Sequence, residues 1–298
     1  MRESAARALV LASSALFGLL FSARDAGAQD AGTVFRVESR LVEVQARVLD
    51  QRNRYIDGLT RDQFEVIDDG KPQKILSFEA TTSETTCAIL LDTTGSMSEA
   101  LPVVKSAVLR FIDRLRPRDQ VAVYSFSNSL RLVQDFTRDK SAAKTAVLRS
   151  RPGGTTALFD ALAGVARDIS DRPGKKAIFV FTDGNDNASI LNVVSASARA
   201  KRSGVPVYTV AQGAALKNGD LVRVLQEVAR SAGGRYYEAR NPAAVAEVFD
   251  DITGDVQHTY LLTYRPPAAM SKEWRPIRLQ VRSPQKLKIL AKEGYFAD

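Results

Sequence analysis

The sequence contains one cysteine and one histidine in 298 residues, and this scarcity removes several classes of site. Cys87 has no second cysteine with which to form an intrachain disulfide. It stands in the apolar run CAILLD, where we predict a buried, unreactive thiol. A structural zinc site is excluded, because such sites draw their ligands from several Cys and His side chains.

Signatures of common enzymes are also missing. His258 lies at the expected end of a helix, where a solvated or dipole-stabilising role is ordinary. A Ser-His-Asp hydrolase usually places its serine in a GxSxG turn, and Gly95-Ser96-Met97-Ser98 lacks the final glycine. There is no GxxxxGK[ST] phosphate loop. An aspartyl-phosphate phosphatase would need a second Asp where Thr94 stands. We predict that the chain is not an enzyme, with an uncharacterised hydrolase as the weaker alternative.

The chain has no apolar run long enough to span a bilayer. Residues 8–23 are uncharged and mostly apolar, but sixteen residues fall short of the roughly 20 that a spanning helix needs. Arg2 and Arg7 precede this run, and Ala26-Gly27-Ala28 offers a small-residue cleavage site after it. Residues 1–28 are therefore predicted to be a signal peptide, with an uncleaved anchor as the alternative. The protein is expected to be exported, periplasmic or secreted, without stable membrane insertion after cleavage.

Basic residues exceed acidic ones, giving a formal net charge of +8, but they do not form one block. Residues 29–85 carry 8 basic and 11 acidic side chains, whereas residues 259–298 carry 8 basic and 3 acidic ones. The basic residues of the tail alternate with apolar ones, as on the solvent face of a strand. We therefore expect no nucleic-acid binding, and we expect the two oppositely charged flanks to associate.

Hydrophobic patterning divides the chain into four parts: a signal peptide (1–28), an N-terminal β segment (29–84), an α/β unit (85–258) and a C-terminal β segment (259–298). In 85–258, apolar strand-like runs such as CAILLD and KKAIFVF alternate with segments of helical spacing. This alternation predicts a doubly wound, mostly parallel six-stranded sheet, a Rossmann-like α/β fold. Because a lone hairpin is marginal in water, the flanks are predicted to form one small β-sandwich-like module around the inserted unit.

Three loops carry oxygen-bearing side chains at the ends of the predicted elements. Asp92, Thr94 and Ser96 follow the run CAILL, Gly153-Gly154-Thr155-Thr156 precedes the helix LFDALAG, and Thr182-Asp183-Gly184 follows KKAIFVF. In a parallel sheet all three loops reach the carboxyl edge, where ligands bind. Two carboxylates and several hydroxyls suit a hard cation, so we predict Mg²⁺, with Mn²⁺ or Ca²⁺ as alternatives. Capping boxes, N-caps and turns are the ordinary structural explanation of each loop taken alone.

These loops resemble the metal-ion-dependent adhesion site of von Willebrand factor type A domains. The run Asp92-Thr93-Thr94-Gly95-Ser96 is similar to the DxSxS signature, with Thr94 where serine is usual. Thr156 matches the threonine of the second loop, and Asp183 matches the aspartate of the TDG loop. Thr155 is a rival to Thr156, which we prefer because TALFDAL resembles the TxLxxAL run of that family. The resemblance implies metal ligands at Asp92, Thr94, Ser96, Thr156 and Asp183.

Three segments of the flanks are similar to the exported bacterial VWFA-related family first defined in acidobacteria. They are LVEVQARVLD, GLTRDQFEVIDDGKPQKILSF and YRPP…EGYF. Together, the resemblances imply a metal-dependent adhesion module that captures a carboxylate on a protein ligand. The alternative is a structural scaffold of the cell envelope whose metal site is vestigial.

Overall fold

The computed structural model describes residues 41–184, 186–267 and 274–297. A six-stranded sheet has the order β10-β9-β8-β5-β6-β7, and all its neighbouring strands are parallel except β6 and β7. Its central strands β5 and β8 are buried along their whole length, as expected for strands covered on both faces. The six are β5 (Thr85–Asp92), β6 (Gln120–Phe126), β7 (Leu130–Thr137), β8 (Lys175–Thr182), β9 (Val207–Gln212) and β10 (Tyr236–Ala239).

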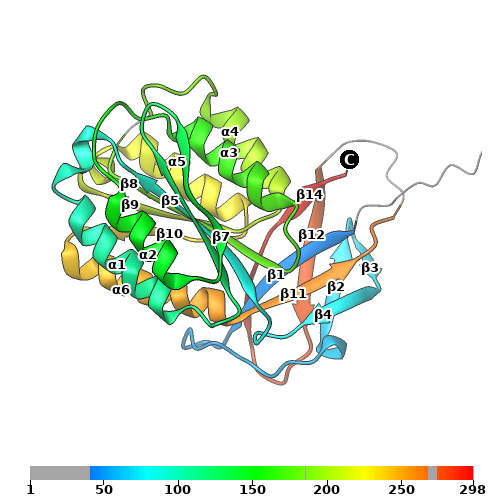
Figure 1. Cartoon of the computed structure of the whole chain (residues 1–298). Helices are drawn as coiled ribbons and strands as arrows, with labels where there is room; N and C mark the ends of the chain where they lie inside the picture. The colour runs from blue at the N-terminus through cyan, green and yellow to red at the C-terminus, as the bar shows by residue number, and fades with distance from the viewer. Residues whose placement is uncertain (1–40, 185, 268–273, 298) are drawn as a thin grey trace, which may run out of the picture. The chain divides into compact units, whose positions relative to one another are not determined.

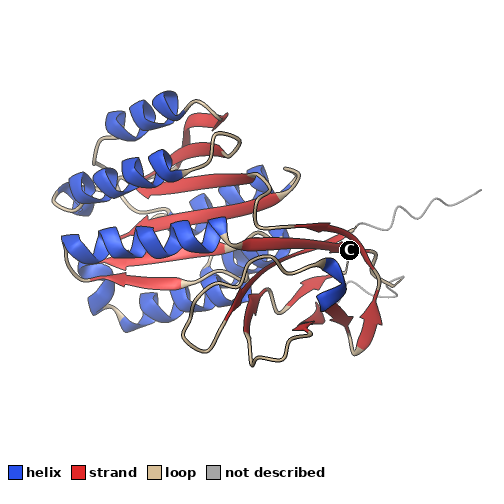
Figure 2. Ribbon diagram, turned by 90° about the horizontal axis from the view of Figure 1, so that it is seen from below, coloured by secondary structure: helices blue, strands red, loops and turns tan. Residues whose placement is uncertain are grey.

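Helices cover both faces of this sheet (Figures 1 and 2). One apolar core joins the sheet to α1, α2 and α6, and a second joins it to α3, α4 and α5. The helices are α1 (Leu101–Arg114), α2 (Lys140–Arg149), α3 (Leu158–Ser170), α4 (Val193–Ser203), α5 (Gly219–Ser231) and α6 (Pro242–Gln257). Short 3₁₀ helices occur at η1 (Arg61–Gln63), η2 (Gly95–Ser98) and η3 (Gly213–Lys217). The predicted doubly wound α/β fold is confirmed.

The segments before and after the α/β unit form two antiparallel four-stranded sheets, with the orders β13-β1-β11-β4 and β14-β12-β2-β3. Each sheet contains strands from before and after the α/β unit, as the sequence predicts. Side chains from both sheets share one apolar core. The strands are β1 (Val42–Leu49), β2 (Phe64–Asp68), β3 (Lys71–Gln73), β4 (Ile75–Glu79), β11 (Thr259–Tyr264), β12 (Trp274–Val281), β13 (Lys288–Ala291) and β14 (Gly294–Phe296). We call this pair of sheets the β module.

The C-terminal run LKILAKEGYF, which reads as one strand in the sequence, forms two. It forms β13 in the first sheet and β14 in the second, so the chain crosses from one sheet to the other between them. The crossing ends at Gly294, where a Cβ atom would lie 2.3 Å from the Arg275 carbonyl oxygen. A side chain at this position would therefore separate β14 from β12.

A buried carboxylate also joins the two flanks. Asp68 of β2 accepts hydrogen bonds from the hydroxyls of Tyr264 (3.0 Å) and Tyr295 (2.8 Å) and from Nε of Arg275 (2.9 Å). All three donors come from the C-terminal flank. Because a buried charge is tolerated when it is paired and hydrogen-bonded, this network favours association of the two flanks.

A second buried network connects β1 to the last turn of α6. Arg47 bonds to the Tyr208 hydroxyl, to the Gly233 carbonyl oxygen (2.5 Å) and to the Asp255 carboxylate (3.3 Å). Asp255 also accepts a hydrogen bond from the Tyr55 hydroxyl at 2.7 Å. The N-terminal flank therefore contacts α6 at the end farther from the carboxyl edge of the sheet.

Cys87 is fully buried in β5, and burial raises the pKa of its thiol well above the ordinary value. The predicted unreactive thiol is consistent with this position. None of the helices in the described ranges is long and apolar enough to cross a membrane. The expected signal peptide, residues 1–28, lies outside the described residues.

Candidate metal centre

The two predicted carboxylate ligands lie at the ends of adjacent strands. Asp92 is the last residue of β5, and Asp183 directly follows β8, its parallel neighbour. The chain continues from β5 to β6 on one side and later returns to β8 on the other, so this is the switch point of the sheet. Both side chains are buried. The fold itself therefore brings these two carboxylates to one place.

A chain of hydroxyls connects the two carboxylates. Asp92 accepts from the Thr94 backbone N–H at 2.9 Å, and the Thr94 hydroxyl lies 3.0 Å from the Ser96 hydroxyl. Ser96 in turn donates to Oδ1 of Asp183 at 2.8 Å. The hydroxyl of Thr182, the last residue of β8, donates to the other oxygen of Asp92 at 2.7 Å. Four of the five predicted residues thus form one hydrogen-bonded cluster.

Thr156 completes the group from the second loop. A Cβ atom at Gly184 would lie 3.6 Å from both the Thr156 and the Ser96 hydroxyl oxygens, so these two oxygens border the same glycine. The Thr155 side chain is exposed and its hydroxyl lies 3.1 Å from Oδ1 of Asn128, away from this group. The structure therefore brings Thr156, and not Thr155, toward the other four residues.

Backbone contacts fix the first loop against the second. The Gly153 N–H donates to the Thr93 carbonyl at 2.8 Å, and the Gly95 N–H donates to the Gly154 carbonyl at 3.3 Å. Gly154 has a φ of 87°, and a Cβ atom there would lie 2.2 Å from Oδ1 of Asn128. Both facts require glycine at this position.

The site carries uncompensated negative charge. Burial raises the pKa of Asp92 above its ordinary value, hydrogen bonds from Thr94 and Thr182 oppose that rise, and the Asp183 carboxylate adds to it. Burial also raises the pKa of Asp183. Within the described residues, neither carboxylate forms an ion pair with a basic side chain. Two buried carboxylates without a basic partner are costly unless a cation or a proton joins them.

The donor set fits a hard divalent cation. It consists of two carboxylates and three hydroxyls, which are the oxygen ligands that Mg²⁺ and Ca²⁺ prefer. In the described ranges no group of three or more His, Cys, Asp or Glu side chains is placed to hold a metal ion. A cation here would therefore rely on the hydroxyls as well as on Asp92 and Asp183.

The alternative interpretation of Ser96 as part of a capping box is wrong. Its hydroxyl donates to Asp183, and the N-cap of α1 is Ala100, which makes no side-chain capping bond. Thr156 does not cap α3 either, because the N-cap position is occupied by Ala157. In these two loops the hydroxyls face the carboxylate cluster instead of the helix termini.

Sequence reasoning missed two asparagines that hold the second loop. Oδ1 of Asn128 accepts from the Thr155 N–H at 2.7 Å, and Oδ1 of Asn187 accepts from the Thr156 N–H at 2.8 Å. Asn128 lies in the short turn between β6 and β7. Asparagine is common in turns and loops, so neither position carries a signal that distinguishes it from an ordinary loop residue.

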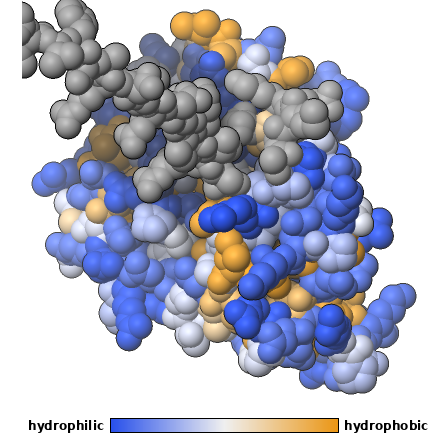
Figure 3. All heavy atoms as spheres, turned by 90° about the vertical axis from the view of Figure 1, so that its right-hand side faces the viewer, coloured by the Kyte–Doolittle hydropathy of each residue, from blue (hydrophilic) through white to orange (hydrophobic). Residues whose placement is uncertain are grey.

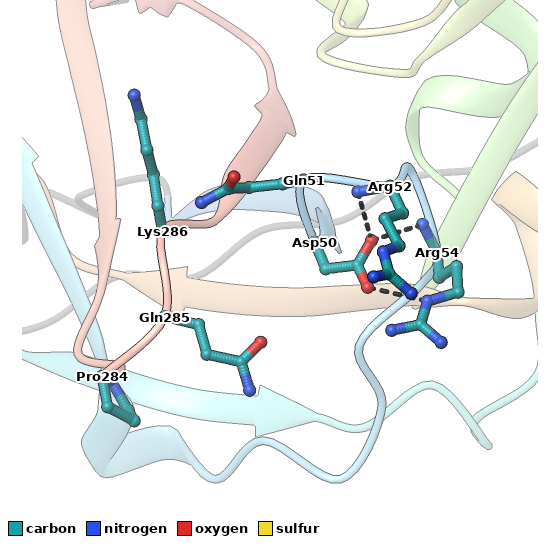
Figure 4. Close-up of a pocket in the computed structure, with 7 residues that line it drawn as sticks. All are labelled: Asp50, Gln51, Arg52, Arg54, Pro284, Gln285 and Lys286. Atoms are coloured by element: carbon teal, nitrogen blue, oxygen red, sulfur yellow. Dashed lines mark hydrogen bonds and ion pairs between the residues drawn. The ribbon is translucent and has the colours of Figure 1, made fainter.

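Away from this cluster, the described residues also line two recesses. One, of about 360 Å³, is a polar recess of the β module between Asp50–Arg54 and Pro284–Lys286 (Figure 4). There, hydrogen bonds from Arg54 and Arg52 lower the pKa of Asp50, whose carboxylate is engaged by those residues. The side of the molecule shown in Figure 3 is mainly hydrophilic, with hydrophobic residues in several separate places.

The second cavity, of about 500 Å³, lies between the first turns of α4 and α5. Val193, Val194 and Val224 line it, and Val194 is 73% exposed. Ile190, three residues before α4, is 96% exposed. Since α4 follows β8 and α5 follows β9, both helices begin at the sheet edge that carries Asp92 and Asp183.

Comparison with known proteins agrees with the fold of residues 85–258. The von Willebrand factor type A domain family matches residues 87–251, more than half of the chain. The chain belongs to this family. A curated relative from Synechocystis sp. (strain ATCC 27184 / PCC 6803 / Kazusa), called uncharacterized protein sll0103, is 30% identical over 170 residues, covering 54% of this chain. The match spans only 39% of that relative's length.

Two solved structures share the fold. The von Willebrand factor type A protein from Catenulispora acidiphila is 17% identical with a TM-score of 0.52, and the match covers 89% of this chain and 76% of that one. Proximal thread matrix protein 1 from the mussel byssus is 18% identical with a TM-score of 0.53, over 68% of this chain and 50% of that one. At these identities the likeness shows the fold alone.

Proposed function

We propose that this chain is an exported, non-enzymatic protein-binding module, and that it captures an acidic group of a protein partner through a bound divalent cation, Mg²⁺ in the first place. The cation would be held by Asp92, Thr94, Ser96, Thr156 and Asp183, some of them through water. The observation that carries the proposal is the meeting of two buried, uncompensated carboxylates with three hydroxyls at one sheet edge.

Charge balance explains why an acidic ligand would complete such a site. Two carboxylates balance the formal charge of a divalent cation, and the hydroxyls add no negative charge to its ligand shell. The ion therefore keeps a strong affinity for a further anionic oxygen. The bound ion would supply a Lewis-acidic attachment point. The protein's own part is to hold the five oxygen ligands on strand ends and short loops.

The surroundings of the cluster favour a protein over a small free acid. Val194 exposes its apolar side chain at the groove between α4 and α5, and Ile190 exposes its own in the loop that leads into α4. The backbone of Ile190 is fixed, since its N–H donates to Asp160 at 2.8 Å. Rigidly held apolar surface beside a polar contact is typical of interaction sites.

A binding role, in preference to catalysis, is supported by the position of the single histidine. His258 follows α6 and lies 2.6 Å from Asp57 of the N-terminal flank, at the end of α6 farther from Asp92. An imidazole base is thus not close to the candidate metal centre. The pattern of residues 1–28 supports export, which would give the module access to surface or envelope partners.

The test is capture from an envelope fraction by the immobilised protein, in Mg²⁺, in EDTA, and after Mg²⁺ is restored. We expect capture in the first and third conditions, and its loss in Asp183→Ala. Converting the carboxyl groups of the fraction to amides beforehand should abolish capture. Undiminished capture in EDTA would contradict the mechanism, whereas Mg²⁺-dependent stabilisation without any carboxylate-dependent capture would favour the scaffold alternative.

A further inference from the structure

Thr156 differs from the other four candidate ligands in its place along the chain: it lies in the loop before α3, whereas the other four end or follow β5 and β8. It precedes α3, whose N-cap is Ala157, so its backbone N–H and C=O lie outside the hydrogen-bond ladder of the helix. Its hydroxyl borders Gly184, and no described residue forms a hydrogen bond with it. Something other than regular secondary structure must therefore hold this residue in place.

The loop after β8 satisfies both backbone groups of Thr156. Oδ1 of Asn187 accepts from the Thr156 N–H at 2.8 Å. The backbone N–H groups of Asn187 and Ala188 both donate to the Thr156 carbonyl, at 2.9 and 3.1 Å. These three bonds leave the Thr156 hydroxyl as the residue's remaining polar group. They also join the loop 153–156 to the loop that carries Asp183.

We infer that Asn187 is a positioning residue of the metal centre: it holds Thr156 so that its hydroxyl faces the cation together with Asp183. The inference rests on the proposed function, because it assigns Asn187 a role toward the ion that the five residues would hold. Groups that orient metal ligands without touching the metal typically change metal affinity by about ten- to a hundredfold when they are removed.

The rest of the loop is anchored independently of Asn187. Asp186 accepts from the Phe159 N–H at 2.9 Å and from the Ser189 N–H at 3.0 Å. Asp160 accepts from the backbone N–H groups of Ile190 and Leu191, at 2.8 and 2.9 Å. Removing the Asn187 side chain should therefore free the Thr156 N–H while the loop stays bound to the start of α3.

Asn128 provides a matched control in the same loop. Its Oδ1 accepts from the N–H of Thr155, one residue before Thr156, at nearly the same distance of 2.7 Å. The two asparagines thus make the same kind of bond to neighbouring residues, but Asn128 holds a threonine that faces away from the cluster. If Asn187 only stabilised the loop, replacing Asn187 or Asn128 by alanine would change Mg²⁺ affinity to the same extent.

The experiment compares wild type, Asn187→Ala, Asn128→Ala and Asn187→Asp by calorimetric titration with Mg²⁺ alone. Thermal unfolding and amide exchange at Thr156 are measured on the same proteins in EDTA. We expect Asn187→Ala to lose about tenfold or more in Mg²⁺ affinity and to exchange the Thr156 amide faster. Asn128→Ala should keep wild-type affinity with a similar loss of thermal stability. Asn187→Asp keeps an acceptor oxygen and should restore the affinity.

Three results would overturn the inference. Mg²⁺ affinity equal to wild type in Asn187→Ala would do so while leaving the proposed function intact. Equal losses of affinity in Asn187→Ala and Asn128→Ala would show that general loop stability is responsible. If wild type itself binds no Mg²⁺, the proposed function fails and this inference fails with it.

Discussion

Lys175 places an ammonium group in a buried position at the first residue of β8. Its Nζ donates to the Thr81 carbonyl at 2.9 Å, and the residue is 1% exposed. Burial is the main cause that lowers the pKa of Lys175 to about 8, and the nearby Arg116 guanidinium acts in the same direction. The folded state therefore releases this proton at a lower pH than the unfolded chain does.

This shift predicts how stability depends on pH. Between about pH 8 and the unfolded pKa near 10.5, the unfolded chain binds more protons at this residue, so the free energy of unfolding rises with pH. We expect urea unfolding between pH 7.5 and 9.5 to show a rise that is smaller in Lys175→Met, by about 1 kcal/mol per pH unit. Lys292, whose pKa burial also lowers to about 8, contributes equally to both proteins. Parallel pH profiles would contradict the account.

At the residue scale, the candidate metal ligands could be predicted from the sequence, but the residues that hold those ligands in place could not. Asp92 and Asp183 directly follow strongly apolar strands, and strand order alone places them at one edge. Asn187 and Asn128 gain their roles from contacts with residues 31 and 27 positions away. No local pattern encodes such pairings, because each depends on how loops from different parts of the chain meet.

At the scale of elements, α2 is the helix that hydrophobic patterning failed to predict. Its sequence KSAAKTAVLR buries only Ala143, Ala146 and Val147, so the apolar stripe is short and weak. A different signal was present, since Asp139 is its N-cap and accepts from the backbone N–H groups of Ser141 and Ala142. The strong periodicity of α3, by contrast, predicted a helix that the structure confirms.

The cap of α2 gives an element-scale prediction. Asp139→Ala leaves two backbone N–H groups of the first turn without their acceptor, and we expect it to lower the free energy of unfolding by about 1 kcal/mol. Asp139→Asn keeps the acceptor oxygen and should stay close to wild type. Chemical denaturation of the three proteins measures the difference. Equal stability of Asp139→Ala and wild type would show that tertiary packing alone fixes this helix.

At the scale of the whole molecule, the two flanks depend on each other for hydrogen bonding. β11 pairs with both β1 and β4, and β12 pairs with β2, so strands of one flank lie between strands of the other. The association of the flanks was predictable from the marginal stability of each alone. The division of LKILAKEGYF between two sheets was not, because the sequence pattern of two short strands resembles that of one longer strand.

Truncation tests this dependence, and with it the boundary predicted between residues 258 and 259. Removing residues 259–298 takes away β11 and β12, so β1 and β4 lose their ladder partners, β2 keeps only β3, and the Asp68 network loses its donors. We expect limited proteolysis to cut within residues 41–80 while residues 85–258 stay resistant, with the full chain as control. Full protection of residues 41–80 in the truncated protein would mean that the flanks fold independently.

The central claim is that Asp92 and Asp183 form one metal centre with the three hydroxyls, and calorimetric titration with Mg²⁺ tests it most directly. The comparison uses wild type, Asp92→Ala and Asp220→Ala, the last removing an exposed carboxylate that pairs with Arg223 at the start of α5. We predict one site per chain in wild type and in Asp220→Ala, and no measurable binding in Asp92→Ala, because a carboxylate that faces the cation would be lost. Undiminished Mg²⁺ binding by Asp92→Ala would contradict the account.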